Sequence, residues 1–545
     1  MRATGFIAFA ILSTFMPAAI VAWNMGAMAP FWFLAGDAYL YLGIGESSSG
    51  LSMSFDGLRP TNGFHPLWQV WVRVATALSS SPLQAMTLVV YSAIALTLAG
   101  VLVLGAAIQR MTGSWLLAML AVPGVYYLII GQALHNLPVW GFFDGMEAGL
   151  AFFIAACIAW LISGIKTTER THRQWWLLGG ALALLVLTRL DEVFVPIAMA
   201  ITILLWPGRA FADRILDAAR IVVPSAIAVA AFVGWSVATT GMLMPVSGAA
   251  KGEGALIANA WVTLATVFAP LIDLREGFTS YEAGREALLG GAFRVLQLVV
   301  PALFAIGFSL VITSRYKAAP GAPLVMGLCG GIVIKAAYSF IGVNYWHQAS
   351  WYFSLAMMTM TFATAILLAP AVRRMTTFSA TLAAAVLATV TILHASLWSA
   401  GLMTDHTRPA QRDFWQDRAA IQTTLLTAEP DLRVIEFGDG LLNFSFDFPV
   451  RHGLVFAGDA QSLDALRDTR LLREAYSDGF TVLSSYEYLR VPIGAEDWNN
   501  TQVRDFLARS FLDDRVKAEL DQFEFSILYV HRPSGVPFIR FSPRR

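Results

Sequence analysis

The segment Gly36–Trp68 gathers many of the side chains best suited to chemistry, with Asp37, Arg59 and His65 among glycines, prolines and aromatic residues. Asp37 comes directly after the aromatic stretch 30–34, so we expect its carboxylate to be partly removed from water. Desolvation raises the pKa of a carboxyl group and makes the carboxylate a better proton acceptor. The spacing therefore predicts that Asp37 is a general base for a hydroxyl group. A helix cap, or an ion pair with Arg59, is the structural alternative.

Four cationic or titratable side chains are candidates for binding a phosphate group. A guanidinium grips phosphate with two parallel hydrogen bonds, whereas an ammonium acts as a point charge. Each candidate also has a structural alternative: a salt bridge for the arginines, a backbone hydrogen bond for the histidine and plain solvation for the lysine. The four are Arg59, His65, Arg189 and Lys251.

A further group of polar side chains occurs in the same or similar loops and could bind the rest of a substrate. Acids at the start of an apolar helix also suit the helix dipole, which is a sufficient structural account of two of them. The segment 344–347 carries Tyr and Trp, which are typical of a membrane-interface belt. The candidates are Asp56, Asn62, Asp144, Glu147, Asp191 and His347.

The composition places these loops in a membrane protein. The 545 residues are 57% hydrophobic and only 14% charged, a combination typical of a polytopic membrane protein. The formal net charge is zero, so nothing indicates a nucleic-acid partner. Cys157 and Cys329 both lie in apolar stretches, which gives no support to a disulfide framework or a zinc site. No glycine-rich phosphate loop follows a strand, so the sequence does not predict a nucleotide site.

About eleven apolar segments are candidates to cross the membrane as helices, each needing roughly 20 apolar residues. The segments 175–188 and 193–206 are short and flank the charged residues 189–192. Because charges at the bilayer centre are costly, we expect two spans that meet at a charged turn. The candidate spans are 5–23 (an uncleaved signal anchor), 83–108, 115–130, 147–164, 175–188, 193–206, 221–240, 294–313, 324–341, 351–369 and 378–400.

The positive-inside rule gives these spans an orientation. If the N-terminus is cytoplasmic, the basic loops all fall inside, whereas the loops with Asp37, Asp144, Arg189 and Lys251 fall outside. Merging 175–206 into one span would reverse every later loop. We therefore predict a multi-pass protein of the inner (cytoplasmic) membrane with an extracytoplasmic C-terminus.

Two domains are expected. Residues 1–401 form a transmembrane helical bundle with an outer loop at 24–82. From 402 to 545 the apolar runs shorten and acids become frequent, which predicts a small extracytoplasmic α/β domain. Its expected strands are 432–437, 453–456, 481–484 and 524–530.

Several motifs together resemble the GT-C superfamily of polyprenyl-phosphate-dependent glycosyltransferases, which includes arabinofuranosyl-, protein mannosyl- and aminoarabinose transferases. The motifs are the first outer loop (GDAYLYLG…RPTNGFHPLW), DGMEAGL at 144–150, LTRLDEV at 187–193, GMLMPVSGAAKG at 241–252 and EFGDGLLN at 436–443. The resemblance extends over nearly the whole chain, although each motif is only moderately specific.

The resemblance implies an inverting transfer of a sugar from a polyprenyl-phosphate donor to a cell-envelope glycan, lipid or protein. Asp37 would deprotonate the acceptor hydroxyl, and the cations named above would stabilise the leaving phosphate. Many members carry two adjacent acids where this chain has Gly36-Asp37, so Asp56 or Glu46 is a candidate for the second acid. The need for Mg²⁺ or Mn²⁺ therefore stays open.

Two other classes of protein compete with an enzyme. A transporter or lipid flippase would move the lipid or glycan without forming a glycosidic bond. Transporters tend to place ionisable groups at mid-bilayer on broken helices, whereas here they collect at one interface, which favours an enzyme. A non-catalytic scaffold that presents the C-terminal domain is the third alternative.

Overall fold

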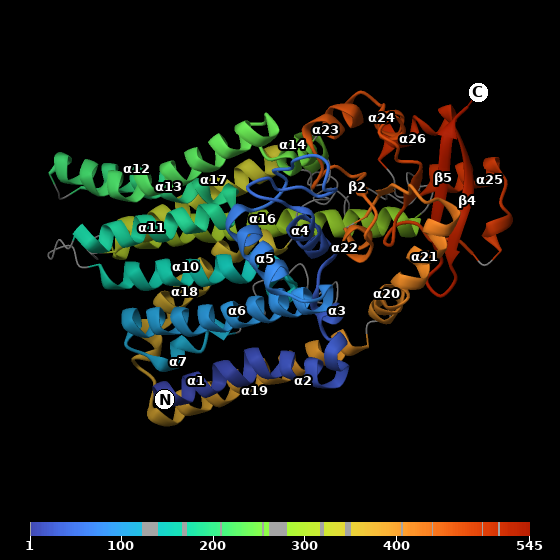
Figure 1. Ribbon diagram of the computed structural model, residues 1–545. Helices are drawn as coiled ribbons and strands as arrows, with labels where there is room; N and C mark the ends of the chain where they lie inside the picture. The colour runs from blue at the N-terminus through green and yellow to red at the C-terminus, as the bar shows by residue number, and fades with distance from the viewer. Residues whose placement is uncertain are drawn as a thin grey trace.

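The computed structural model shows a mainly helical protein, in which a bundle of long helices adjoins a small C-terminal domain built on a sheet (Figure 1). The residues that the structure describes are 2–122, 140–165, 172–207, 210–252, 255–260, 281–316, 321–343, 350–404, 407–438, 440–492, 494–510 and 513–544.

Seven helical segments in the described residues are long and apolar enough to cross a membrane, which makes the protein a multi-pass membrane protein. They are Ala3–Met28, which contains α1 (Ala3–Ala10) and α2 (Met16–Met25), α6 (Pro82–Thr112), α13 (Phe211–Thr240), Leu298–Arg315 of α16 (Tyr281–Arg315), α17 (Ala322–Gly342), α18 (Ser354–Val372) and α19 (Thr377–Met403). The shorter apolar helices α10 (Ala148–Gly164), α11 (His172–Thr188) and α12 (Phe194–Leu205) complete the bundle. The number of eleven spans stays a prediction.

Two short helices occupy the region for which a charged turn was predicted. α11 and α12 are separated by the 3₁₀ turn Leu190–Val193. Arg189 takes an extended backbone conformation (φ −148°, ψ 109°), which ends α11 before the turn. The charged residues therefore lie at a junction between helices and not along an apolar helix face.

Basic and acidic residues lie at opposite ends of α10. Glu147 precedes its first residue, while Arg110 approaches its last turn, with the guanidinium 5.0 Å from the centre of the Trp160 ring. Arg373 also reaches this basic end, where it donates to the Thr112 carbonyl at 3.4 Å. A helix of 17 residues spans about 25 Å, so the two groups of charges are separated by most of a bilayer core.

Short helices at the acidic end come from the predicted outer loop (24–82) and from two later connections. They are α3 (Pro30–Phe33), α4 (Gly36–Ser47), α5 (Pro66–Leu78), α9 (Trp140–Phe143) and α14 (Val246–Lys251). A proline occupies the first turn of α5, where its missing N–H costs no hydrogen bond. Residues Ala38–Gly45 of α4 are buried, because α4 is enclosed between α5 and the C-terminal domain.

The C-terminal domain contains a five-stranded sheet with the order β2-β1-β3-β5-β4. Its strands are β1 (Val434–Glu436), β2 (Val450–His452), β3 (Val482–Ser484), β4 (Phe523–His531) and β5 (Val536–Pro543). β1 pairs in parallel with β2 and β3, with Val434 opposite Val450 on one side and Val482 on the other. β5 runs antiparallel to both β3 and β4. The predicted strand at 453–456 is wrong: these residues form a turn after β2, and Val455 has a φ of +64°.

Helices α20 (Thr407–Gln416) and α21 (Arg418–Ala428) connect the bundle to this sheet (Figure 1). The remaining helices of the domain are α22 (Leu441–Ser445), α23 (Ala460–Arg467), α24 (Leu471–Ser477), α25 (Asn500–Arg509) and α26 (Asp514–Lys517). α22 follows β1 directly and packs on α4. Gly440, with a φ of +90°, allows this approach, because a Cβ there would lie 2.9 Å from the backbone nitrogen of Leu40.

Candidate active site

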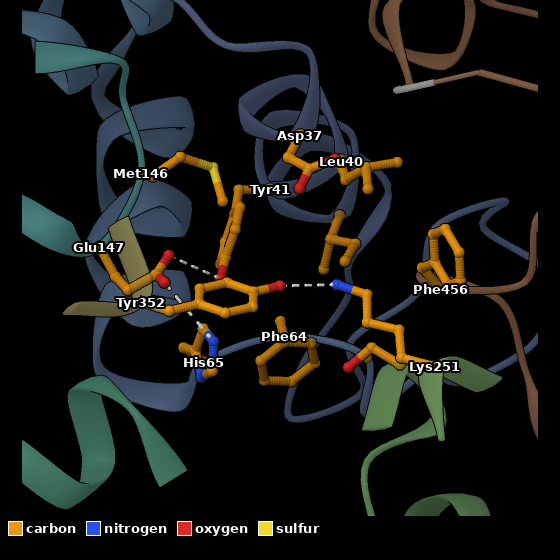
Figure 2. Close-up of a pocket in the computed structure, with 13 residues that line it drawn as sticks. Asp37, Leu40, Tyr41, Phe64, His65, Met146, Glu147, Lys251, Tyr352 and Phe456 are labelled. Atoms are coloured by element: carbon orange, nitrogen blue, oxygen red, sulfur yellow. Dashed lines mark hydrogen bonds and ion pairs between the residues drawn. The ribbon is translucent and has the colours of Figure 1, made fainter. Parts of the chain in front are cut away.

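A cavity, partly open to solvent, lies where the outer loop, α10, α14 and the C-terminal domain meet (Figure 2). Polar and aromatic side chains from segments far apart in the sequence converge on it. It is lined by Asp37, Leu40, Tyr41, Ile44, Gly63, Phe64, His65, Met146, Glu147, Ser247, Lys251, Tyr352 and Phe456.

Asp37, in the first turn of α4, is half-buried and directs its carboxylate into the cavity (Figure 2). Within the described residues, no side chain is hydrogen-bonded to this carboxylate. Burial raises the pKa of Asp37 above the ordinary value of 3.8, and Lys251 opposes that rise only in part. The side chain therefore has the accessibility and the basicity that a proton acceptor needs.

Lys251, the last residue of α14, faces Asp37 from the other side of the cavity (Figure 2). Its ammonium donates a hydrogen bond to the hydroxyl of Tyr352 at 3.0 Å. The same nitrogen lies 5.8 Å from the centre of the Tyr352 ring and 5.2 Å from that of Phe456. These contacts hold a positive charge at the cavity wall.

Glu147 connects three side chains beneath the cavity. It is fully buried and forms an ion pair with Arg189. It also accepts a hydrogen bond from the Tyr41 hydroxyl at 3.1 Å, and its Oε1 lies 3.5 Å from Nε2 of His65. A buried carboxylate with these partners fixes the orientation of the side chains around it.

Arg189 extends this network away from the cavity. Its guanidinium makes two hydrogen bonds of 3.2 Å to Asp191 and stacks on Tyr352 with 4.3 Å between Cζ and the ring centre. Burial disfavours both charged forms, but the attraction between the two charges has a larger effect. The pKa of Arg189 is therefore raised and the pKa of Asp191 is lowered. Both side chains are therefore ionised, and Arg189 is engaged by protein carboxylates.

Lys335 closes the network from α17. Its ammonium lies 3.0 Å from Asp191, 2.5 Å from Glu192 and 2.8 Å from the Tyr352 carbonyl oxygen. The last of these contacts fixes the backbone of the tyrosine that binds Lys251. The charged residues between α11 and α12 therefore help to fix the position of Tyr352 in the cavity wall.

His65 lies at the N-cap of α5 and lines the cavity. Burial lowers its pKa to about 4, so the imidazole is neutral at pH 7. Its Nδ1 is buried and makes no hydrogen bond in the part of the chain that the structure describes. A neutral imidazole here can donate a hydrogen bond to a ligand but supplies no charge.

Asn62 joins the outer loop to the segment that carries Lys251. Its side-chain amide donates to Ser236 at 2.7 Å and to the Met244 carbonyl at 3.1 Å. Its oxygen accepts from the backbone N–H of Val246, the first residue of α14, at 2.8 Å. Asn62 does not line the cavity; it positions α14 and thereby Lys251.

The acids Asp144 and Asp56 lie beside the cavity and do not line it. Asp144 is fully buried, accepts from the Met146 N–H at 2.9 Å, and has a pKa that burial raises well above 3.8. Asp56 accepts from the backbone N–H groups of Leu58 and Arg59 at 2.8 and 2.9 Å, so its carboxylate closes a turn of the outer loop.

Arg59 contacts the C-terminal domain and not the cavity. Its guanidinium lies 2.6 Å from Asp478, 3.2 Å from Glu474 and 3.4 Å from Asp459. These three carboxylates occupy its donors. His347, the remaining candidate from the sequence, lies outside the described residues.

The side chains at the site that were not predicted from the sequence include Tyr41, Tyr352 and Phe456, which line the cavity, and Lys335, which lies behind it. Lys335 had a usable signal, because an ionisable residue within an apolar span marks a functional site by default. The aromatic residues had none, since similar residues occur throughout the spans.

The described residues contain no group of three or more His, Cys, Asp and Glu side chains arranged to hold a metal ion. Glu147, the acid that lines the cavity with Asp37, is already paired with Arg189.

No protein-family model and no curated protein matches the chain. Solved structures similar to it include the following two. ArnT from Cupriavidus metallidurans bound to undecaprenyl phosphate is 12% identical, with 96% of this chain and 98% of that chain covered and a TM-score of 0.45. The Archaeoglobus fulgidus oligosaccharyltransferase in complex with Zn and sulfate is 13% identical, with 91% and 67% covered and a TM-score of 0.38.

Both are GT-C glycosyltransferases, the superfamily that the loop motifs resemble. At these identities and TM-scores the likeness by itself assigns no activity to the chain. The chemistry has to be argued from its own residues.

Proposed function

We propose that this protein is an inverting membrane glycosyltransferase that moves a sugar from a polyprenyl-phosphate donor to an acceptor hydroxyl. The observation that carries the proposal is the pairing of Asp37 and Lys251. A carboxylate that has no hydrogen-bond partner among the described residues faces an ammonium across a cavity at one end of the membrane helices. The motifs of these two segments are among those that resemble the GT-C superfamily.

Asp37 and Lys251 have different roles in the proposed reaction. Asp37 takes the proton of the acceptor hydroxyl as the oxygen attacks the anomeric carbon of the donor sugar. The new glycosidic bond forms as the bond from that carbon to the phosphate oxygen breaks, so the anomeric configuration inverts. Lys251 stabilises the negative charge that develops on the leaving polyprenyl phosphate. His65 is close enough to donate a neutral hydrogen bond to the same ligand.

The charged network holds this arrangement in place. Arg189 is saturated by Glu147, Asp191 and the Tyr352 ring, so we assign it to orienting these groups and not to binding phosphate. Glu147 in turn holds Tyr41 and lies beside His65. The expectation that Arg59 binds phosphate is replaced by a role in joining the outer loop to the C-terminal domain.

We assign the end of the donor's isoprenoid tail nearest the phosphate to a second cavity. It lies between α16, α17 and α18, and Tyr352 lines both cavities. Apart from Glu192, Lys335 and Tyr352, its walls are apolar: Leu298, Pro301, Ile332, Ala336, Phe353, Leu355 and Ala356. A tail between these helices places its phosphate near Lys251.

The distribution of charges supports an orientation in the membrane. Arg110 and Arg373 lie at the end of the bundle opposite Glu147, and basic residues mark the cytoplasmic side. We therefore place the cavity and the C-terminal domain on the outer face of the inner membrane. The acceptor is accordingly a glycan, lipid or protein of the cell envelope.

Asp37→Asn tests the proposal. Detergent-purified protein is incubated with synthetic polyprenyl-phosphate hexoses and pentoses that carry a radiolabelled sugar, together with delipidated cell-envelope extract as acceptor. The variant is expected to transfer about 10²–10⁴-fold more slowly, the usual contribution of a general base. Asp464→Asn, at an exposed position of α23, is the control and keeps full activity. Unchanged transfer in Asp37→Asn removes the base role. Movement of labelled lipid across reconstituted vesicles without a new glycosidic bond identifies a flippase.

A further inference from the structure

The turn after β2 brings a side chain of the C-terminal domain into the candidate active site. Phe456, in the segment Gly453–Gly458, lines the same cavity as Asp37 and Lys251 (Figure 2). It is the only residue of the C-terminal domain in the lining of this cavity, as far as the described residues show. The soluble domain therefore completes the wall of a site that the membrane domain begins.

The backbone holds Phe456 in a defined position. Val455 has a φ of +64°, a left-handed conformation that is rare for a β-branched residue. Hydrogen bonds on both sides of it support this conformation: Val455 N–H to the His452 carbonyl at 3.2 Å and Gly458 N–H to the Val455 carbonyl at 3.0 Å. His452 also accepts from the Ala457 N–H at 3.1 Å. Local strain of this kind persists where surrounding contacts enforce it, often at functional sites.

Two contacts tie this turn to the outer loop. A Cβ at Gly63 would lie 2.1 Å from the carbonyl oxygen of Phe456, so only a glycine lets the two backbones approach so closely. Asp459, which follows the turn, is an ion-pair partner of Arg59 at 3.4 Å. Arg59 and Gly63 therefore hold the Phe456 turn against the loop from two points.

The position of the ring relative to Lys251 suggests what it binds. The ammonium lies 5.2 Å from the centre of the Phe456 ring. A phosphate held by this ammonium carries its sugar one bond further on, within reach of the same ring. An aromatic face is flat and apolar, and it complements the C–H face of a sugar ring.

We propose that Phe456 is the platform on which the sugar ring of the donor stacks, and that Arg59 positions this platform through Asp459. The inference rests on the proposed function and adds to it the part of the donor that the C-terminal domain recognises. It also explains why an arginine of the outer loop is directed away from the cavity.

The test measures the contribution of the sugar ring to binding affinity separately from that of the phosphate. The full-length protein in detergent is titrated with a synthetic polyprenyl phosphate, and with its hexosyl and pentosyl derivatives. Wild type is expected to bind at least one sugar-bearing lipid about 3- to 10-fold more tightly than the bare phosphate, the range typical of one aromatic contact. Phe456→Leu loses this preference and keeps its affinity for the bare phosphate, whereas Phe456→Tyr retains the preference. Phe506→Leu, on α25 against Trp498, is the matched control and behaves as wild type.

Each outcome has a distinct meaning. If wild type binds none of the lipids, the proposed function fails and the inference fails with it. If wild type prefers the sugar-bearing lipid and Phe456→Leu keeps that preference, the platform is refuted while the proposed function stands. A wild type that binds all lipids equally also refutes the platform.

Arg59 is tested as a positioning residue. Arg59→Met is expected to reduce the preference for the sugar-bearing lipid and to leave the affinity for the bare phosphate unchanged. If Arg59 acts through Phe456, the double variant with Phe456→Leu is no worse than Phe456→Leu alone. Additive losses in the double variant, or a loss of affinity for the bare phosphate, contradict the positioning role.

Discussion

The ion pair between Arg189 and Glu147 provides a sharp test of the network beneath the cavity. The side chain of Arg189 is 2% exposed and that of Glu147 is fully buried. Replacing Arg189 with methionine keeps the apolar volume and leaves two carboxylates without their guanidinium. Removal of one partner of a buried pair typically costs 3–5 kcal/mol, because the other charge stays buried and uncompensated.

The remaining contacts place the expected cost toward the lower end of that range. Asp191 is 20% exposed and keeps Lys335 at 3.0 Å, so it is only partly stranded. Glu147 keeps the Tyr41 hydroxyl at 3.1 Å and a neutral His65, neither of which supplies a positive charge. We therefore expect a loss of about 3 kcal/mol in the free energy of unfolding.

Chemical unfolding of the detergent-solubilised protein measures this loss. Arg532→Met is the control and is expected to leave the stability nearly unchanged, since its pair with Glu496 lies at the surface (78% and 35% exposed). The double variant Glu147→Gln with Arg189→Met removes the stranded charge and is expected to recover about 1–3 kcal/mol. An Arg189→Met variant as stable as Arg532→Met, or a double variant less stable than Arg189→Met, would refute the assignment.

Two further predictions follow from the same geometry. The pKa of His65 is about 4 in the folded protein against an ordinary value of 6.5, so the unfolded chain binds the proton more readily. Stability is therefore lost as the pH falls from about 6.5 towards 4. His65→Gln is expected to weaken this loss, measured as the difference in the free energy of unfolding between pH 7.5 and pH 5. If that difference is the same in the variant and in wild type, His65 does not titrate in this way. Gly440→Ala introduces both a strained φ and a Cβ 2.9 Å from the Leu40 backbone, whereas Gly494→Ala introduces the strained φ (+89°) into open space. We expect Gly494→Ala to lower the free energy of unfolding by about 1–2 kcal/mol and Gly440→Ala to lower it by about 1–3 kcal/mol more. Gly440→Ala is also expected to slow transfer, because α22 packs on the helix that carries Asp37. Equal losses of stability in the two variants would mean that the close contact between α22 and α4 contributes nothing.

The mainly helical membrane fold with its small C-terminal sheet domain could be predicted from the sequence. Long apolar runs have few alternatives to membrane helices, because each backbone polar group in lipid must be satisfied within the helix. The break between α11 and α12 was also readable, since residues 189–192 are charged between two apolar runs. The strand expected at 453–456 was not, because its apolar residues form a turn whose backbone is set by tertiary contacts.

In the candidate site, too, some features could be predicted from the sequence and others are decided only by the tertiary structure. Asp37, His65, Glu147 and Lys251 could be named from the sequence, because charged residues beside membrane spans are few and costly. Only the tertiary structure decides that Arg59 turns away to Asp459, Glu474 and Asp478 while Arg189 lies behind the cavity. A guanidinium binds whichever carboxylates lie within reach: the partners of Arg59 lie 400 or more residues away in the sequence, and Glu147 lies 42 residues from Arg189. The sequence thus determines which residues can do chemistry, and the packing of distant segments determines which of them share a cavity.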